Sequence, residues 1–241
     1  MSAIKISGML EKTLWATYAS AYDDLARYYK PYKDVINAAE AGIVSGVLPG
    51  RALDAGCGTG ELSLRLIRRS FSVDALDISR AMLSVFRKKL RPLEPGFKLK
   101  IRRGDLNRKL PYPSSCFDAV ASIHALFMLD DKIAAVREFD RVLKPGGLLV
   151  ISHNRPVLVG SLFGVELKEN GITGLAVNFI RLFRVGIINL LLSRLHRKIY
   201  GITPVSDIIT YMKEKGYKLL KKRVMYRGFD DFIVLRKGRK K

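Results

Sequence analysis

The sequence predicts an α/β fold, a doubly wound and mostly parallel sheet with helices on both faces. Three observations support this. Residues 53–62 (LDAGCGTGEL) join a short apolar strand to a helix through three glycines at alternate positions. A second alternating strand follows at 72–77 and ends in an acid. Strands and helical runs then continue to alternate, which requires a parallel sheet covered on both faces.

The periodicity of apolar residues places the elements in order. We expect strands at about 52–55, 73–77, 99–102, 119–122 and 148–152, and helices at 62–69, 81–90 and 132–143. Near the C-terminus, Thr203 and Pro204 have the residue types of an N-cap and a first helical residue, and Gly216 ends that helix at Lys215. Two strands, at 218–225 and 231–236, complete the chain.

The turn after the first strand has the composition of a nucleotide-cofactor site. Gly56, Gly58 and Gly60 lack a Cβ atom, so the backbone can turn sharply and let a ligand approach its amides. The helix that starts near Glu61 points its N-terminal N–H groups toward the same space. A tight strand-to-helix connection without a ligand is the alternative.

Asp77 ends the second strand, seventeen positions after Gly60. At about that offset in doubly wound folds, a carboxylate accepts hydrogen bonds from ribose hydroxyls. The alternative is that Asp77 caps the helix at 81–90. Ser79 fills that cap more naturally, which leaves Asp77 free for a ligand.

The glycine spacing is GxGxG, not the GxGxxG of dinucleotide dehydrogenases, and with Asp77 it resembles motif I of class I S-adenosylmethionine-dependent methyltransferases. GDLNR at 104–108 resembles the family's adenine-contacting segment, and FDAVASIHALFMLDD at 117–131 its fourth strand and loop. REFDRVLKPGGLLVISHN at 137–154 resembles the helix, KPGG turn and fifth strand of the type 11 branch, which includes menaquinone and ubiquinone methylases. The resemblance implies a seven-stranded Rossmann-like sheet with an antiparallel hairpin at its edge, and S-adenosyl-L-methionine as cofactor.

The resemblance also implies roles for single residues. Asp105 would accept a hydrogen bond from the adenine amino group, and Ser122 would face the methionyl part of the cofactor. The expected cofactor-binding residues are Asp54, Gly56, Cys57, Gly58, Gly60, Asp77, Ile78, Asp105, Leu106 and Ser122.

Methyl transfer requires that the methyl group and the nucleophile be held in line and that water be excluded, with a base where the acceptor starts protonated. His124 stands where type 11 members often carry Asn, and it is the first candidate for substrate positioning or general base. A hydrogen-bonded polar residue at a strand end is the alternative.

Tyr22 is the second catalytic candidate. It lies in YASAYDDLARYYKPY at 18–32, which resembles the helical cap before the first strand in type 11 members. We expect its aromatic residues to close over the cofactor. Tyr18, Tyr22 and Tyr29 fall on one helix face, and a core stripe is the alternative.

The chain of 241 residues, 48% of them hydrophobic, is expected to form a single domain. We divide it into an N-terminal helical cap (1–48), a cofactor-binding core (49–154), a helical lid or insertion (155–203) and a C-terminal helix and strand pair (204–241). The first residues do not have the pattern of a secretion signal, so we expect a cytoplasmic location. Cys57 and Cys116 are expected to be reduced packing residues, and the three histidines lack zinc-site spacing, so no metal is expected.

The insertion contains a strongly apolar helical run from Leu175 to Lys198. Its longest uncharged piece is nine residues, far short of the roughly 20 needed to span a bilayer. The run is amphipathic, with a wide apolar arc. A lid packed on the sheet, a helix lying in a lipid interface and a dimer contact all remain open, as does the oligomeric state.

The excess of basic residues indicates which kinds of partner the protein binds. The chain carries 43 basic and 22 acidic residues, and the last 61 residues carry 17 and four. Such an excess calls for an anionic partner, membrane or nucleic acid. The amphipathic helix ending in RLHRK favours an anionic membrane. The sequence has no [DN]PPY segment after the fourth strand and no cysteine placed to attack a pyrimidine, which weakens the case for nucleic acid.

We therefore expect a methyltransferase acting on a small-molecule or lipid-like acceptor, such as a quinone or a phospholipid head group, as a peripheral protein of an anionic membrane. An RNA methyltransferase that uses the basic C-terminal region is one alternative. A cofactor-binding protein without turnover is another.

Overall fold

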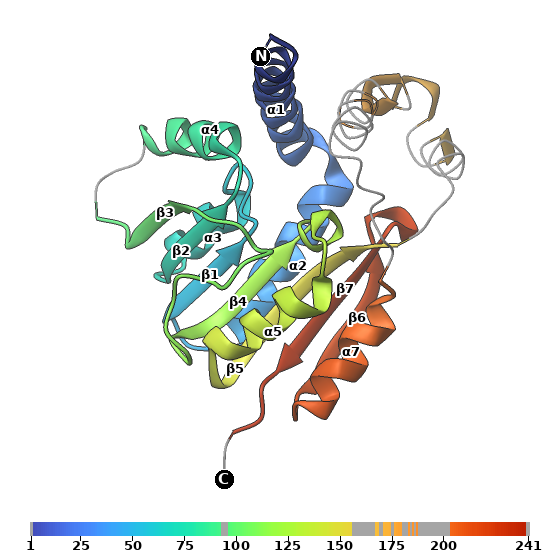
Figure 1. The fold of residues 1–241 in the computed structure, drawn as a ribbon. Helices are drawn as coiled ribbons and strands as arrows, with labels where there is room; N and C mark the ends of the chain where they lie inside the picture. Colours follow the sequence, from blue (N-terminus) through green and yellow to red (C-terminus); the bar gives the residue numbers. More distant parts are fainter. Residues whose placement is uncertain are drawn as a thin grey trace.

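The computed structural model describes residues 2–92, 96–155 and 203–239, together with 167–168, 171–174, 176–179, 183, 185 and 187. Figure 1 shows one sheet with helices on both sides. Its strands are β1 (Arg51–Ala55), β2 (Ser72–Asp77), β3 (Leu99–Arg103), β4 (Phe117–Ile123), β5 (Leu143–Asn154), β6 (Lys218–Met225) and β7 (Asp230–Arg236). Its helices are α1 (Ser2–Tyr28), α2 (Lys30–Gly46), α3 (Glu61–Arg68), α4 (Arg80–Leu90), α5 (Lys132–Val142) and α7 (Val205–Glu214), with 3-10 turns η1 (Leu126–Met128) and η2 (Tyr226–Gly228).

The seven strands follow the order β3-β2-β1-β4-β5-β7-β6. Strands β1 to β5 are parallel, and β7 runs antiparallel between β5 and β6. The predicted fold class and the antiparallel pair at the sheet edge are confirmed. The strand order reverses between β1 and β4, and ligands of open α/β sheets bind outside the carboxyl ends of the strands at such a point.

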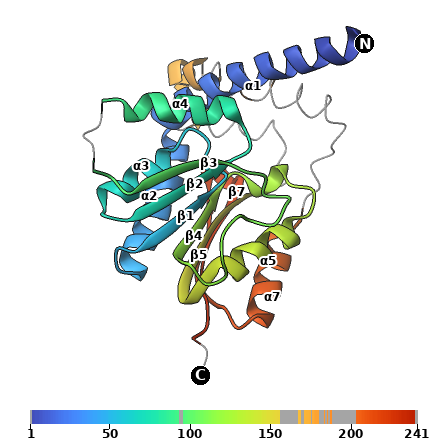
Figure 2. The same ribbon diagram turned by 60° about the vertical axis from the view of Figure 1, so that its left-hand side comes forward.

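The two faces of the sheet bury separate apolar clusters. Along β4, Ala119 and Ala121 pack with the side of the sheet covered by α1 to α4, whereas Val120 packs with the side covered by α5 and α7. Figures 1 and 2 show the two helical layers on either side of the strands. This alternation is the period of two that a sheet buried on both faces requires.

Helix α1 runs beside α4, and its N-terminal part extends past the sheet (Figure 2). It ends at Tyr28, and Pro31 occupies the first turn of α2, where its missing N–H is tolerated. The predicted single helix face of Tyr18, Tyr22 and Tyr29 is therefore wrong, because Tyr29 lies in the extended break between the two helices. The predicted cap of residues 1–48 contains α1 and α2.

Most predicted boundaries agree with the structure to within a few residues. Helix α7 has Pro204, not Thr203, as its N-cap residue. Gly216 has a φ of +81° just after α7, as expected for a residue that ends a helix. Strand β5 begins at Leu143, so the predicted KPGG turn lies within it.

Much of the predicted insertion, including Asn189, Ser193 and His196 of the helical run 175–198, lies outside the described residues. Among the residues that are described, no helix is long and apolar enough to cross a membrane.

Candidate active site

The glycine turn links the end of β1 to the start of α3. Gly56, Gly58 and Gly60 have φ angles of +80°, +53° and +82°, a region that favours glycine. A Cβ on Gly60 would lie 2.3 Å from the Phe86 ring, so this glycine is packed against α4. Among the described residues, a Cβ on Gly58 would meet Tyr22 Cε1 at 3.6 Å and no closer atom. Gly58 therefore lies on the open side of the turn.

The backbone amides of the turn are bound inside the protein. Gly56 N and Cys57 N donate to Leu76 O at 2.8 and 3.0 Å, and Gly58 N donates to Asp77 Oδ2 at 2.9 Å. The expectation that these amides would face a ligand is therefore not what the structure shows. These amides join the turn to β2. The glycines contribute to a ligand site by leaving space that a side chain would fill.

Asp54 fixes the first turn of α3 to β1. Its Oδ2 accepts hydrogen bonds from Ser63 N at 3.1 Å and from Ser63 Oγ at 2.6 Å. Burial raises the pKa of Asp54 to about 6, because the charged form loses its water. The carboxyl group is thus costly to keep ionised, and its predicted contact with the cofactor stays a prediction.

Asp77 joins the ends of β1 and β2. In addition to its bond from Gly58 N, its Oδ1 accepts from Ser79 N at 2.8 Å, and burial raises its pKa. Ser79 is the N-cap of α4 and accepts from Met82 N, so the alternative that Asp77 caps this helix is excluded. Each oxygen of Asp77 keeps a further lone pair, so ribose hydroxyls can still donate to it. The neighbouring Ile78 is half exposed.

Asp105 and Leu106 follow β3 beside the turn. Asp105 Oδ1 accepts from Asn107 N at 2.9 Å, and its Oδ2 lies 3.6 Å from Arg108 Nε. Leu106 is buried, with Cδ1 3.5 Å from the position of a Cβ on Gly56. The structure thus brings the loop after β3 against the turn, and the contact of Asp105 with adenine stays a prediction.

His124 lies at the end of β4, beside the turn. Its Nε2 lies 3.3 Å from Asp230 Oδ2, and its backbone N donates to Ser152 O. The next residue, Ala125, has its Cβ 2.3 Å from where a Cβ on Gly56 would be. His124 therefore directly precedes a residue that packs on the glycine turn, and its side chain reaches the start of β7.

A row of aromatic contacts connects the turn to His124. Tyr22, next to Gly58, has its ring centroid 5.5 Å from that of Tyr32 and donates a hydrogen bond to the Tyr32 hydroxyl at 3.2 Å. Tyr32 and Tyr226 each meet the His124 ring edge to face, at 5.6 and 4.9 Å. The two residues predicted as catalytic are thus brought into one cluster.

Tyr18 and Tyr29 lie deeper in the same region. They are 4% and 0% exposed and belong to the apolar core, which favours the core-stripe alternative for these two residues. Tyr22 is less buried and faces the turn.

Sequence reasoning missed Asp230, Ser152 and Tyr226. Nothing in the spacing of Asp230 marks it, because it reaches His124 through the antiparallel pairing of β7 with β5. The Ser152 hydroxyl donates to Asp230 Oδ2 in the buried interior. Tyr226 has a positive φ of 49°, an uncommon backbone conformation for a residue other than glycine. This conformation marks the residue only once the structure is known.

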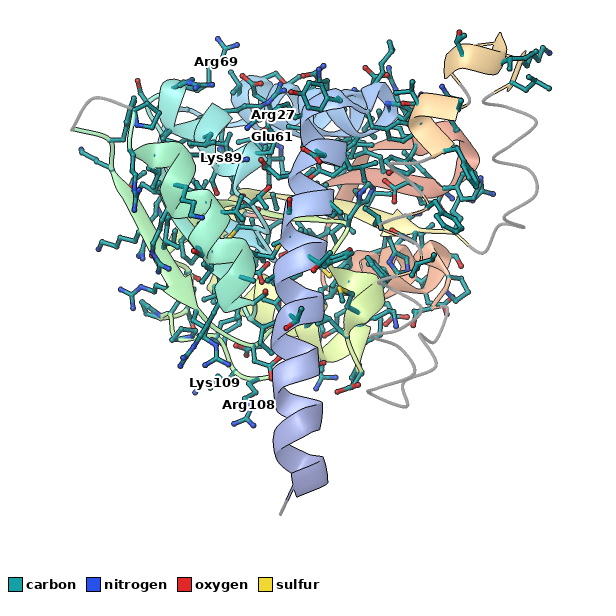
Figure 3. The ribbon with its side chains drawn as sticks, turned by 90° about the horizontal axis from the view of Figure 1, so that it is seen from above. Arg27, Glu61, Arg69, Lys89, Arg108 and Lys109 are labelled. Atoms are coloured by element: carbon teal, nitrogen blue, oxygen red, sulfur yellow. The ribbon has the colours of Figure 1, made fainter. Side chains whose placement is uncertain are left out.

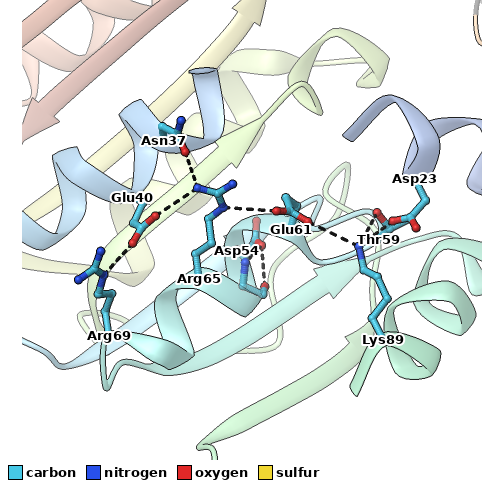
Figure 4. Close-up of polar contacts among 10 residues, drawn as sticks. Asp23, Asn37, Glu40, Asp54, Thr59, Glu61, Arg65, Arg69 and Lys89 are labelled. Atoms are coloured by element: carbon cyan, nitrogen blue, oxygen red, sulfur yellow. Dashed lines mark hydrogen bonds and ion pairs between the residues drawn. The ribbon is translucent and has the colours of Figure 1, made fainter. Parts of the chain in front are cut away.

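Lys89 connects α4 to the site from the other side, as Figure 4 shows. Its Nζ lies 2.7 Å from Asp23 Oδ1 on α1, 3.4 Å from Thr59 Oγ1 in the turn and 3.8 Å from Glu61 Oε2 on α3. One ammonium group therefore holds three elements around the turn, and Figure 3 places it between α4 and α1.

These features fit S-adenosylmethionine. Gly58 leaves space that a Cβ would fill, Asp77 can accept from the ribose, and the loop of Asp105 lies beside them. The Ser122 hydroxyl is completely buried, and none of the described residues forms a hydrogen bond with it. Alternation along β4 places Ser122 on the side of α5 and α7, so its predicted contact with the cofactor stays a prediction.

The chain has two cysteines, one of them in the glycine turn. Cys57 is buried in the turn, its pKa is raised by burial, and Cys116 is partly exposed. Both are free thiols. In the described part of the chain, no three His, Cys, Asp or Glu side chains are placed to hold a metal ion.

Comparison with known proteins shows a methyltransferase domain. The family model of a methyltransferase domain, type 11, matches residues 53–151, from β1 into β5. YqeM of Bacillus subtilis is 32% identical over 154 residues, which cover 62% of this chain and 59% of YqeM. The ubiquinone/menaquinone biosynthesis C-methyltransferase UbiE of Vibrio cholerae is 39% identical over 120 residues, covering 47% of this chain and 45% of UbiE. The matches thus span about half the length of these curated relatives.

Among solved structures, magnesium protoporphyrin IX methyltransferase of Synechocystis PCC 6803 with bound S-adenosylhomocysteine has a TM-score of 0.60 and 18% identity, covering 86% of this chain and 84% of the other. At this identity the likeness concerns the fold.

Proposed function

Because residues 53–151 belong to the type 11 branch of the class I S-adenosylmethionine-dependent methyltransferases, we propose that this chain transfers a methyl group to a small-molecule or lipid-like acceptor. The observation that carries the proposal is the glycine turn, with Asp77 bonded to Gly58 and Tyr22 beside the open side of that residue. S-adenosylmethionine supplies an electrophilic methyl group. The residues of this chain bind it, align the acceptor and exclude water.

In this proposal Asp77 binds the ribose and Tyr22 closes over the turn. His124 positions the acceptor or removes its proton, because it follows β4 and directly precedes Ala125, which packs on the turn. A quinone is one candidate acceptor, supported by the name and the 39% identity of UbiE. A phospholipid head group is another lipid-like candidate.

The proposal includes contact with an anionic membrane. Ile172, Val177, Phe179, Phe183 and Ile187 of the insertion are 38% to 78% exposed. Val185 of the same segment is buried in the core and ties it to the folded domain. Exposed apolar side chains on a chain with a net charge of +21 are the combination that anionic lipid surfaces attract.

A second candidate function is RNA methylation, for which α4 and β3 supply a specific observation. Their outer surface and the following loop expose many cationic side chains with few acids between them, among them Arg87, Lys88, Lys100, Arg102, Arg103 and Arg108. Figure 3 shows Arg108 and Lys109 near each other at the outer edge of the molecule. A basic surface next to Asp105 is suited to phosphate backbones.

Two measurements test the proposed function. Titration calorimetry with S-adenosylhomocysteine should show binding, with nicotinamide and flavin nucleotides as controls that do not bind. The protein is then incubated with radiolabelled methyl donor and host extract, and the lipid, small-molecule and nucleic-acid fractions are counted. Label in lipid or small molecules supports the first proposal, and label in RNA favours the second. Binding of the donor without label in any fraction would leave the third candidate, a cofactor-binding protein without turnover.

A further inference from the structure

We propose that Asp230, supported by Ser152, holds His124 in the tautomer whose Nδ1 accepts a proton, and that the methyl acceptor presents a hydroxyl group on an aromatic ring to this base. The inference rests on the proposed methyltransferase function and deepens it. It adds two positioning residues and a chemical class of acceptor.

The geometry links three strands. His124 follows β4, Asp230 begins β7, and Ser152 lies on β5 between them. His124 Nε2 is 3.3 Å from Asp230 Oδ2, and the same oxygen accepts the Ser152 hydroxyl. Asp230 is 1% exposed, so its carboxylate is shielded from water.

This arrangement sets the proton positions on the imidazole. A carboxylate next to Nε2 favours a proton on that nitrogen, since it can accept the N–H bond. The lone pair then lies on Nδ1. The carboxylate also stabilises the imidazolium that forms when Nδ1 takes up a proton, as in other pairs of a histidine base and its orienting acid.

The imidazole ring also contacts tyrosines. Tyr32 of α2 and Tyr226 of η2 meet it edge to face, and Tyr22 of α1 is bonded to Tyr32. Burial raises the pKa of all three tyrosines, so they stay neutral at working pH. Asp230 is the acidic neighbour of the ring, 3.3 Å from Nε2.

The acid and the aromatic rings around His124 favour one chemical class of acceptor. An acceptor carboxylate would lie near the Asp230 charge and would need no base. The tyrosine rings offer edges and faces on which a flat aromatic ring packs well. A phenolic hydroxyl starts protonated near neutral pH, so it both fits the aromatic surroundings and requires a base.

The backbone around the base is held in an uncommon conformation. His124, Tyr226 and Arg227 have φ angles of +50°, +49° and +56°. Non-glycine residues in this region are kept there by their surroundings, and they cluster at functional sites. Here the conformation aims the His124 ring between Tyr32 and Tyr226.

In the proposed reaction, proton transfer to His124 precedes methyl transfer. The acceptor O–H bond breaks, its electron pair stays on oxygen and the proton goes to His124 Nδ1. The phenolate then takes the methyl group, at oxygen or at a ring carbon that it activates, and the donor sulfur keeps the electron pair of the broken S–C bond. After transfer at carbon, the displaced ring proton leaves to solvent.

The first test is a spectrum that needs no turnover. The chain has three histidines, so ¹⁵N-histidine labelling and a His124→Asn spectrum assign the His124 ring nitrogens. We expect Nε2 to carry the proton in the unaltered protein and Asp230→Asn to lose this preference. The matched control is Asp231→Asn, whose neighbour is Arg155 at 3.5 Å and which should leave the His124 signals unchanged. A His124 tautomer that is the same with and without the Asp230 carboxylate overturns the positioning role.

The second test separates positioning from folding. With hydroquinone as acceptor, Asp230→Asn should lower kcat by at least about 100-fold, while its Kd for S-adenosylhomocysteine stays within about twofold. Ser152→Ala, which keeps the carboxylate, should lower kcat by about tenfold. With 4-nitrophenol, already ionised at pH 8, the Asp230→Asn defect should shrink to a few-fold.

An equal defect on both phenols overturns the base assignment. Methylation of an amine probe such as phenethylamine with no methylated phenol from hydroquinone or from extract overturns the acceptor class. If the unaltered protein does not bind S-adenosylhomocysteine, the proposed function fails. The role of Asp230 is tested separately, because the tautomer of His124 in the unaltered protein and in Asp230→Asn is measured without cofactor.

Discussion

Lys89 Nζ lies 2.7 Å from Asp23 Oδ1, and this ion pair joins α4 to α1 directly beside the glycine turn. The two side chains are 16% and 15% exposed, so the pair is largely sheltered from solvent. Asp23 follows Tyr22 in the chain. The ion pair therefore fixes the part of α1 from which Tyr22 reaches Gly58.

Replacement of Lys89 by Met should weaken cofactor binding. The variant keeps the aliphatic stem but removes the charge, so α4 loses its ion pair to Asp23 of α1 and its hydrogen bond to Thr59 in the turn. A partly sheltered ion pair contributes about 1 kcal/mol, so we expect a roughly fivefold weaker Kd for S-adenosylhomocysteine by calorimetry. Lys88→Met, at the exposed neighbouring position of α4, is the control. Equal affinities for the two variants would contradict the role of the ion pair.

Replacement of Gly58 by Ala should distinguish the effect of backbone strain on stability from the effect of the added methyl group on cofactor binding. The new methyl group enters the open side of the turn, where the nearest described atom is 3.6 Å away. Gly216→Ala is a matched control, because Gly216 also has a positive φ, of +81°, and has no described atom within 4 Å of the added Cβ. Both variants should lose about 1 kcal/mol of unfolding free energy. The affinity for S-adenosylhomocysteine should fall by at least about tenfold in Gly58→Ala alone.

The sequence predicted the sheet and the turn because both depend on local patterns. The alternation of apolar strands and helices, and the three glycines at alternate positions, can each be recognised within short stretches of the sequence. Ser79 as the cap of α4 was predictable for the same reason. The parallel direction of β1 to β5 followed from the same alternation, and the antiparallel pair at the sheet edge followed from the family resemblance.

The partner of His124 could not be predicted, because it depends on contacts between distant residues. Asp230 is 106 positions away in the chain, and it meets His124 since β7 inserts between β5 and β6. The break at Tyr29 was missed for a different reason. The spacing of tyrosines suggests a continuous helix face, whereas Pro31 sets the start of a new helix.

Asp54 predicts a pH dependence of stability. Its folded-state pKa of about 6 lies above its ordinary value of 3.8, so its contribution is fully present below about pH 4 and is lost as the pH rises through 6. A shift of this size corresponds to about 3 kcal/mol. Asp54→Asn can still accept the bonds from Ser63, so it should raise the unfolding free energy at pH 7.5 by up to that amount.

The same variant should be no more stable than the original protein at pH 4, where both side chains are neutral. Urea unfolding at the two pH values measures this. A cofactor role for Asp54 would appear as weaker binding of S-adenosylhomocysteine in the more stable variant, a loss of function with a gain in stability. An Asp54→Asn stability change that is the same at pH 4 and pH 7.5 would contradict the raised pKa.

Phe179 and Phe183 provide the sharpest test of membrane contact. Their rings stack at 5.2 Å, and the residues are 38% and 52% exposed, so the pair presents apolar surface to solvent. Burying one such ring in lipid contributes about 1.5 kcal/mol or more, so replacing both by Ser should weaken binding to phosphatidylglycerol vesicles by at least about tenfold in co-sedimentation. Phe97→Ser, at a residue 43% exposed in the loop before β3, is the control and should bind as the unaltered protein does. Binding to neutral vesicles that equals binding to anionic ones, with no effect of salt, would remove the electrostatic part of the proposal.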